Sequence, residues 1–398
     1  MKFNKWTVGL AAVGLVSLTS AAKAEEKPNM VETALSSTSL SGYVDTSAQW
    51  NFGTGNANMP AYRFGGPEKA DGFNLNVVQL RLERPLDESE WAAGYRADLW
   101  FGPDANTLGT QSWGNSGDMA IRQAYVALRM PVFNGIDWKV GVFDSIIGYE
   151  SVESPNNPNY TRSYGHTLEP TTHTGVLATY RFSELVSVAA GIANTVAPQI
   201  NSRAHSVYDN AYLGGDHAES YKTYMGSVAI TAPESLGWLA GSTLYAGAVN
   251  GFNNNLDDED ADDYGEVQSN YYLGTTLATP VAGLRMGAAF DLLNWDNSGE
   301  TWALAGYASY QATEKMSLHA RADYLRDRGD QKYLPMNSDK VLALTGTVQY
   351  DLWKNLISRL ELRWDHALDS VETFGADSDD DADLKNSWML AANLIYKF

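Results

Sequence analysis

The sequence predicts an all-β chain whose antiparallel strands close into a barrel that spans a membrane. Many segments of roughly ten residues alternate apolar and polar side chains with a period of two, as strands with two different faces do. The connections between these segments alternate between short and long, which a barrel threaded through a membrane requires and a two-sheet sandwich does not. The last such segment ends on Phe398, although solvated chain ends are usually polar. We therefore expect Phe398 to lie in the strand that closes the barrel.

Composition excludes several other classes of protein. The chain has 398 residues, a net charge of −20 and no cysteine, so neither a disulfide framework nor a thiolate metal site is expected. The acidic balance argues against nucleic acid as a partner. Residues 1–24 join Lys2 and Lys5 to an apolar run and to Ala22-Lys23-Ala24, which predicts a cleaved secretory signal peptide. Beyond it no run of about 18 apolar residues occurs, so the exported chain is a barrel or a soluble periplasmic β-protein.

Residues 25–39 are polar, and we expect a short, mostly disordered periplasmic lead there, followed by one barrel domain over 40–398. The predicted strands are 40–52, 73–85, 91–101, 119–131, 136–146, 173–183, 185–194, 222–232, 242–251, 269–279, 283–295, 301–311, 315–326, 339–351, 356–368 and 387–398. They number about sixteen, and bacterial single-chain barrels have an even number. A strand of about 11 residues, tilted by ~40°, rises ~28 Å, which matches the apolar band of such barrels.

The connections sort into two classes that alternate along the chain. The short ones are 86–90, 132–135, 183–184, 233–241, 281–282, 312–314 and 352–355, and the long ones are 53–72, 102–118, 147–172, 195–221, 252–268, 327–338 and 369–386, with 296–300 as the weak member of the long class. This pattern predicts periplasmic turns at one end of the barrel and extracellular loops at the other.

The alternation also assigns the two faces of each strand. Residues such as Tyr95, Leu318 and Leu360 are expected to face lipid, while charged residues between them face the lumen. Soluble sheets alternate in the same way with the opposite meaning, so the sorted connections decide between the two. One strand does not fit this assignment of faces. The register of 119–131 places Arg122 on the lipid side unless a β-bulge intervenes.

Residues 122–180 carry a set of motifs. They are Arg122-Gln123-Ala124-Tyr125-Val126, Lys139-x-Gly141-x-Phe143, Gly148-Tyr149-Glu150, Asn157-Pro158-Asn159-Tyr160-Thr161-Arg162-Ser163-Tyr164 and Glu169-Pro170-Thr171-Thr172-His173-Thr174-Gly175-Val176. This run resembles the OmpL-like β-barrel porins, also called the porin-2 family. The resemblance implies an outer-membrane channel protein and no particular solute. The sequence departs from the family where Pro158-Asn159 follows Asn157 in place of a bulky aromatic residue.

Candidate site residues lie around the connection 147–172. In barrels of this size the corresponding loop commonly folds inward and narrows a lumen that is otherwise wide. The charged residues at the loop, Asp144, Glu150, Glu153 and Arg162, are expected to face a basic wall. This wall is formed by Arg96, Lys139, Arg321, Arg359 and Arg363, and Asp98, Asp323 and Glu361 are further candidates that line the pore. Such an arrangement would set a transverse field that selects ions. Two alternatives stay open: the loop charges only pack the loop, or the wall arginines pair with Asp98, Asp323 and Asp365 as salt bridges.

Two acidic segments, 257–263 and 377–383, lack the glycine and terminal glutamate of an EF-hand loop. They are either a solvated rim or loose sites for Ca²⁺ or Mg²⁺ that bridges lipopolysaccharide phosphates. Ser317, His319 and Asp323 share one strand face, but strand residues two apart point in parallel and do not converge as a catalytic triad must. We expect no enzymatic activity and no cofactor.

These observations favour a porin in the outer membrane of a Gram-negative bacterium that lets small hydrophilic solutes or ions diffuse passively. The partners expected are outer-membrane lipid, lipopolysaccharide and the barrel-assembly machinery, which would bind the C-terminal strand ending at Phe398. A homotrimer is left open. The alternative function is a structural or adhesive outer-membrane barrel whose lumen is plugged by its own loops.

Overall fold

The computed structural model describes residues 31–32, 38–52, 56–87, 89–111, 117–204, 221–252, 267–295, 299–328, 333–376 and 382–398. The expected signal peptide 1–24, the acidic segment 257–263 and residues 377–381 of the second acidic segment lie outside these ranges. No helix in the described part of the chain is long and apolar enough to cross a membrane.

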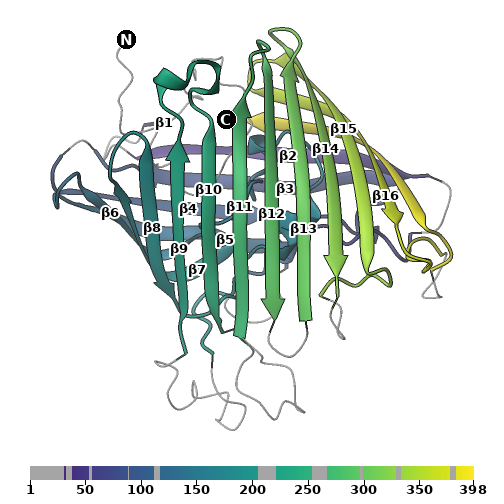
Figure 1. Cartoon of the computed structure of the whole chain (residues 1–398), viewed down its shortest axis with the longest axis horizontal. Helices are drawn as coiled ribbons and strands as arrows, with labels where there is room; N and C mark the ends of the chain where they lie inside the picture. The colour runs from purple at the N-terminus through teal and green to yellow at the C-terminus, as the bar shows by residue number, and fades with distance from the viewer. Residues whose placement is uncertain are drawn as a thin grey trace.

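Sixteen antiparallel strands form a closed barrel (Figure 1). They are β2 (Ser39–Asn51), β3 (Gly72–Arg84), β4 (Ala92–Phe101), β5 (Met119–Met130), β6 (Ile136–Asp144), β7 (Thr172–Arg181), β8 (Val186–Ala193), β9 (Thr223–Thr231), β10 (Thr243–Phe252), β11 (Val267–Ala278), β12 (Leu284–Trp295), β13 (Gly299–Gln311), β14 (Met316–Asp327), β15 (Lys340–Trp353), β16 (Leu356–Ala367) and β17 (Asn386–Lys397). Each strand pairs with the next, and β17 pairs with β2. The predicted strands and the predicted fold class are confirmed.

The C-terminal residue takes part in the closure, as expected. The backbone N–H of Phe398 donates to the carbonyl oxygen of Gly42 at 3.0 Å, and the Gly42 N–H donates to the Phe398 carbonyl at 2.9 Å. A Cβ atom at Gly42 would lie 2.0 Å from the backbone oxygen of Gln79 and 2.8 Å from the Phe398 ring. Glycine is therefore required where the two ends of the barrel wall meet.

Two residues of the expected lead 25–39, besides those next to and within β2, are described by the structure. A two-residue strand, β1 (Val31–Glu32), pairs antiparallel with Ser39 and Leu40 at the start of β2. Leu40 itself belongs to β2, which begins one residue earlier than predicted.

Side-chain exposure follows the predicted two faces. Leu344 and Leu360 on the outer face are 44 % and 53 % exposed, whereas Ala343 and Glu361 on the inner face are fully buried. Exposed leucines on a barrel wall and buried charges inside it are the reverse of a soluble sheet, which hides its apolar face. Tyr95 and Leu318 are exposed as expected.

Aromatic residues gather near the ends of strands that join the long connections. Trp364 stacks on Trp388 with ring centroids 5.8 Å apart, and Trp302 lies 5.2 Å from Tyr324. Because β16 ends and β17 begins at the first pair, these rings belong to one rim of the barrel. Aromatic girdles of this kind mark the membrane interface of outer-membrane barrels.

A β-bulge resolves the position of Arg122. Asp98 of β4 pairs with Gln123 of β5, but the next residue, Leu99, pairs with Ile121. Arg122 is the extra residue on β5, and the bulge turns its side chain inward beside that of Gln123. The guanidinium is fully buried in the lumen and does not face lipid.

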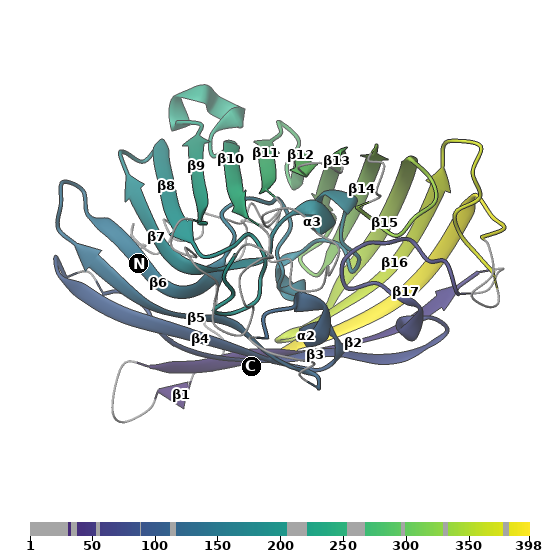
Figure 2. The ribbon, with the colours of Figure 1, turned by 90° about the horizontal axis from the view of Figure 1, so that it is seen from below.

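The lumen holds two short helices that belong to long connections. Figure 2 shows α2 (Pro103–Leu108) and α3 (Tyr164–Leu168) inside the ring of strands. Helix α2 follows β4 and packs on β3, β4 and β5, while α3 packs on β12, β13 and β14 across the barrel. The connection between β6 and β7, which contains α3, therefore reaches the opposite side of the barrel.

Candidate functional site

Residues 145–171, which we call the inner loop, join β6 to β7 and run through the lumen. Connecting segments usually lie on the surface, yet nearly all side chains of the inner loop are buried. The N–H of Ser145 donates to the Thr171 carbonyl at 2.9 Å, which closes the base of the loop against the strand ends. The inner loop thus leaves the wall at one point and returns at the same point.

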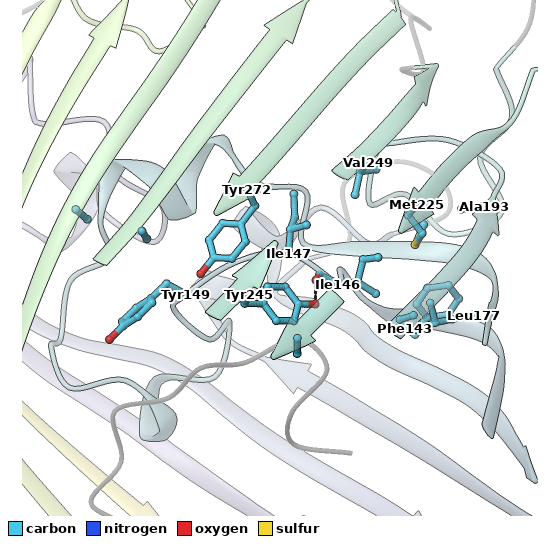
Figure 3. Close-up of a cluster of buried hydrophobic side chains, with 14 of the residues drawn as sticks. Phe143, Ile146, Ile147, Tyr149, Leu177, Ala193, Met225, Tyr245, Val249 and Tyr272 are labelled. Atoms are coloured by element: carbon cyan, nitrogen blue, oxygen red, sulfur yellow. Dashed lines mark hydrogen bonds between the residues drawn. The ribbon is translucent and has the colours of Figure 1, made fainter. Parts of the chain in front are cut away.

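Apolar side chains fix one side of the inner loop. Ile146, Ile147 and Tyr149 pack against tyrosines of the inner wall, as Figure 3 shows for Tyr245 and Tyr272. The hydroxyl of Tyr245 donates to the Ile146 carbonyl. This contact anchors the loop to strands on the far side of the barrel.

Glycines in the wall make room for these side chains. A Cβ atom at Gly287 would lie 1.9 Å from the Tyr149 hydroxyl, and one at Gly247 would lie 2.7 Å from a methyl group of Ile147. The ring of Tyr149 stacks on that of Tyr307 with centroids 4.0 Å apart. The wall and the loop are therefore complementary in shape at this contact.

Charged residues of β3, β4 and β5 fix a second part of the inner loop. The group comprises Arg81, Arg96, Arg122, Asp98, Asp144 and Glu153. The Glu153 carboxylate of the loop accepts from Arg96 at 3.1 Å and pairs with Arg122 at 2.9 Å. The same two arginines bind Asp98 at 2.8 and 2.7 Å. With three arginines and three carboxylates, the buried charge is compensated.

A third contact lies on the opposite wall at β14. Arg321 is buried and donates to the Glu150 carboxylate at 2.9 Å and to Asp323 at 2.8 Å. Its guanidinium also donates to the backbone carbonyls of Thr161 and Arg162, at 2.7 and 3.0 Å. One side chain of the wall therefore satisfies both a loop carboxylate and the loop backbone.

Strand β16 completes the attachment. Glu361 accepts from the N–H groups of Tyr160 and Thr161 at 2.6 and 2.9 Å. Arg359 donates to the Asn157 carbonyl at 2.5 Å, and Arg363 donates to the Arg162 carbonyl at 2.7 Å. Because a coil inside the lumen lacks a strand partner, these wall side chains supply the hydrogen bonds that its backbone requires.

The predicted site residues fall into three groups in the structure. Those that contact the inner loop or one another are Arg96, Asp98, Asp144, Glu150, Glu153, Arg321, Asp323, Arg359, Glu361 and Arg363. Arg162 was expected to face the basic wall but turns back on its own loop, where it donates to the carbonyls of Ser151, Val152 and Tyr160. Lys139 lies apart from the charged groups around Glu153 and around Arg321, and its Nζ atom is 5.0 Å from the centre of the Tyr125 ring.

The wall arginines are paired within their own strands. Arg96 with Asp98, Arg321 with Asp323 and Arg363 with Asp365 each form a salt bridge between residues two apart. The alternative in which these charges are lumen salt bridges therefore describes the geometry better than an open transverse field. A compensated network produces little field in the lumen, so its main effect is to position the loop.

Sequence reasoning missed three arginines of this site. Arg81 pairs with Asp98 and with Glu153, and the period-two pattern of its strand could have placed it inward. Arg122 is turned inward by a bulge that no pattern in the sequence marks. Arg63 comes from the long connection before β3 and donates to the carbonyl of Glu169 at 2.9 Å.

Two buried carboxyl groups meet where the inner loop crosses β12. Glu169 of the loop lies beside Asp291 of the wall, and Nδ1 of His166 lies 3.3 Å from the Glu169 carboxyl. Burial, together with the neighbouring Asp291 charge, raises the pKa of Glu169 well above its usual range. Burial lowers the pKa of His166 well below its usual range, so this imidazole stays neutral at pH 7. The carboxyl pair must share a proton to remain in contact.

We expect the attachment of the inner loop to weaken as the pH rises. Because the folded loop favours protonated Glu169, its contribution to stability is complete below the ordinary glutamate pKa of about 4.3 and is lost as the pH passes the raised value. Limited proteolysis within the loop should therefore be faster at pH 8 than at pH 5. The variant Glu169→Gln mimics the protonated acid and should remove most of this pH dependence, and an unchanged dependence would contradict the assignment to Glu169.

The possible catalytic residues Ser317, His319 and Asp323 all lie on β14. The hydroxyl of Ser317 donates to Gln311, and His319 shares its hydrogen bond with Ser309, so these residues do not form a triad with Asp323. Within the described ranges, no group of three or more histidine and acidic side chains could hold a metal ion.

The fold and the loop inside it define a class of protein, the outer-membrane porins, whose sixteen- to eighteen-stranded barrels surround a lumen. The chain belongs to the family described as "Putative beta-barrel porin-2, OmpL-like", whose model matches residues 37–398. The resemblance seen in residues 122–180 is confirmed and extends over nearly the whole chain.

Solved structures of low sequence identity share the fold. The outer membrane channel DcaP of Acinetobacter baumannii is 14 % identical, with a TM-score of 0.58 over 91 % of this chain and 97 % of that one. The anion-selective porin from Comamonas acidovorans is 11 % identical, with a TM-score of 0.57 over 91 % and 99 %. A trimer form of OmpT from Vibrio cholerae is also 11 % identical, with a TM-score of 0.55 over 91 % and 99 %. No curated protein matches the chain by sequence.

Proposed function

We propose that the protein is a passive, water-filled diffusion channel for small hydrophilic solutes or ions, narrowed by the inner loop. The observation that carries this proposal is the attachment of the loop to walls on both sides of the lumen, at Glu153 and at Glu150. A segment fixed in this way sets a constant width for the path beside it. No reaction and no cofactor are part of the proposal.

Several further expectations belong to this function. Residues 1–24 would direct export, and the strand that ends at Phe398 would be bound by the barrel-assembly machinery. Lipid and lipopolysaccharide would surround the exposed leucines, with Ca²⁺ or Mg²⁺ at the acidic segments 257–263 and 377–383. Assembly into a homotrimer is supported by the trimer form of OmpT, which has a similar fold.

A plugged structural or adhesive barrel is the second candidate function. It is favoured by the other inward segments, since Arg63 donates to the Glu169 carbonyl and buried Lys69 pairs with Asp104 of α2. These contacts add material to the lumen beside the inner loop.

Single-channel recording in planar bilayers separates the two functions. We expect the folded, detergent-purified protein to give discrete current steps whose size is proportional to the applied voltage. Protein of verified β-barrel circular dichroism that gives no steps would favour the plugged barrel and would contradict the channel.

A further inference from the structure

A cavity of about 290 Å³ with both polar and apolar lining residues lies beneath the inner loop, at the end of the barrel that carries the short turns. Its roof is formed by Pro155, Asn157 and Pro158 of the loop, and its side by the turn between β11 and β12. The polar side chains on its walls include Arg285, Ser309, Gln311, Ser317, His319 and Gln349. No aspartate or glutamate is among the described residues that line it, although the whole chain carries a net charge of −20.

Arg285 differs from the arginines that hold the inner loop. Arg321 and Arg363 are fully committed to carboxylates and backbone carbonyls, as described above. Arg285 lies on the inner face of β12, is partly exposed, and forms neither an ion pair nor a hydrogen bond with the described part of the chain. Its guanidinium therefore keeps all of its donors for a molecule that enters the cavity.

Neutral donors surround this charge. Nδ1 of His319 lies 2.7 Å from the Ser309 hydroxyl, and Nε2 of the same ring is buried without a hydrogen-bond partner. If Ser309 donates to Nδ1, the ring carries its proton on Nε2 and presents a second donor beside the cavity. The volume is near the lower end of the range for small-molecule pockets, about 300 Å³.

We propose that this cavity is a selectivity site for small anions, in particular hydrophilic solutes that carry a carboxylate, with Arg285 as its charged residue. The inference rests on the proposed channel function and adds to it the class of solute. An anion would pass the cavity with its charge against the guanidinium and its polar groups against the hydroxyl and amide side chains. The net charge of the chain alone would favour cations, so the proposal predicts the opposite sign of selectivity.

The reversal potential in a KCl gradient tests this proposal. We expect the protein to favour chloride, and Arg285→Gln to lower the chloride-to-potassium permeability ratio about sixteenfold. A unit charge ~5 Å away in water changes the population of each ion by about fourfold, and the lost attraction for chloride multiplies the lost repulsion of potassium. Arg285→Lys keeps the charge and should retain the ratio. Arg203→Gln removes a positive charge from the connection after β8, outside the cavity, and should retain it as well.

The outcomes separate this inference from the function on which it rests. A conducting channel that favours potassium, or whose permeability ratio is the same in Arg285→Gln, would overturn the anion site and leave the channel intact. Silence of the folded protein would overturn the channel itself. As a measurement that needs no variant, citrate added on the short-turn side should reduce the chloride current, and the absence of any block would also count against the site.

Discussion

Replacement of Arg321 by methionine is expected to release the inner loop from β14 while the barrel stays closed. The guanidinium is buried between the Glu150 and Asp323 carboxylates, at 2.9 and 2.8 Å. Its removal leaves two buried charges without their cation, and breaking such a network costs roughly 3–5 kcal/mol. The loop can escape this cost by leaving the wall, whereas β14 is held by continuous pairing with both neighbours.

In this variant, limited proteolysis reports the attachment of the inner loop, and thermal unfolding reports the stability of the barrel. We expect cleavage within the inner loop to accelerate, while the melting of the β-sheet circular dichroism signal changes little. Thr345→Val is the matched control, because its hydroxyl lies 3.3 Å from the same guanidinium and should contribute less than about 1 kcal/mol. A loop that stays resistant to protease in Arg321→Met would show that Arg321 does not hold it.

Replacement of Glu361 by alanine is the second change with a large expected effect. Its carboxylate accepts the N–H groups of Tyr160 and Thr161, and the hydroxyls of Thr161 and Thr347 at 2.6 and 2.7 Å. In the alanine variant two buried N–H groups lose their acceptor, at about 1–3 kcal/mol each. Their total is similar to the cost expected for Arg321→Met.

Hydrogen exchange reads out this effect at the residues concerned. The amides of Tyr160 and Thr161 should exchange much faster in Glu361→Ala, while the amides of β15 and β16 remain protected. Glu361→Gln keeps one carbonyl oxygen as an acceptor and should lie between the alanine variant and the unaltered protein. If the two loop amides are equally protected in all three proteins, Glu361 is not their anchor.

The strands could be predicted from the sequence because each carries its own signal. A period of two puts Leu344 and Leu360 outside and Ala343 and Glu361 inside, and this pattern needs no knowledge of the partner strand. The pattern around Arg122 left open whether a bulge occurs there and could not decide the question, because one inserted residue reverses the apparent face without changing the composition.

The sequence predicted which residues lie near the inner loop better than it predicted the contacts between them. Alternation placed Arg321 and Glu361 in the lumen, and the length of the connection placed the loop near them. That Glu361 would accept from the backbone of Thr161 could not be predicted, because the two residues are 200 positions apart and the bond depends on how the loop folds. That Arg63 reaches into the lumen could not be predicted from the sequence, because its segment forms no strand and carries no periodic pattern.

If the inner loop, held by the wall, sets the width of an open lumen, a shorter loop must widen the path for ions. Single-channel conductance of the full chain beside a variant in which residues 148–169 are replaced by a short Gly/Ser linker tests it most directly. We expect current steps from both proteins, with a conductance several times larger for the shortened loop. Equal conductance of the two folded proteins, or steps from the shortened variant alone, would contradict it.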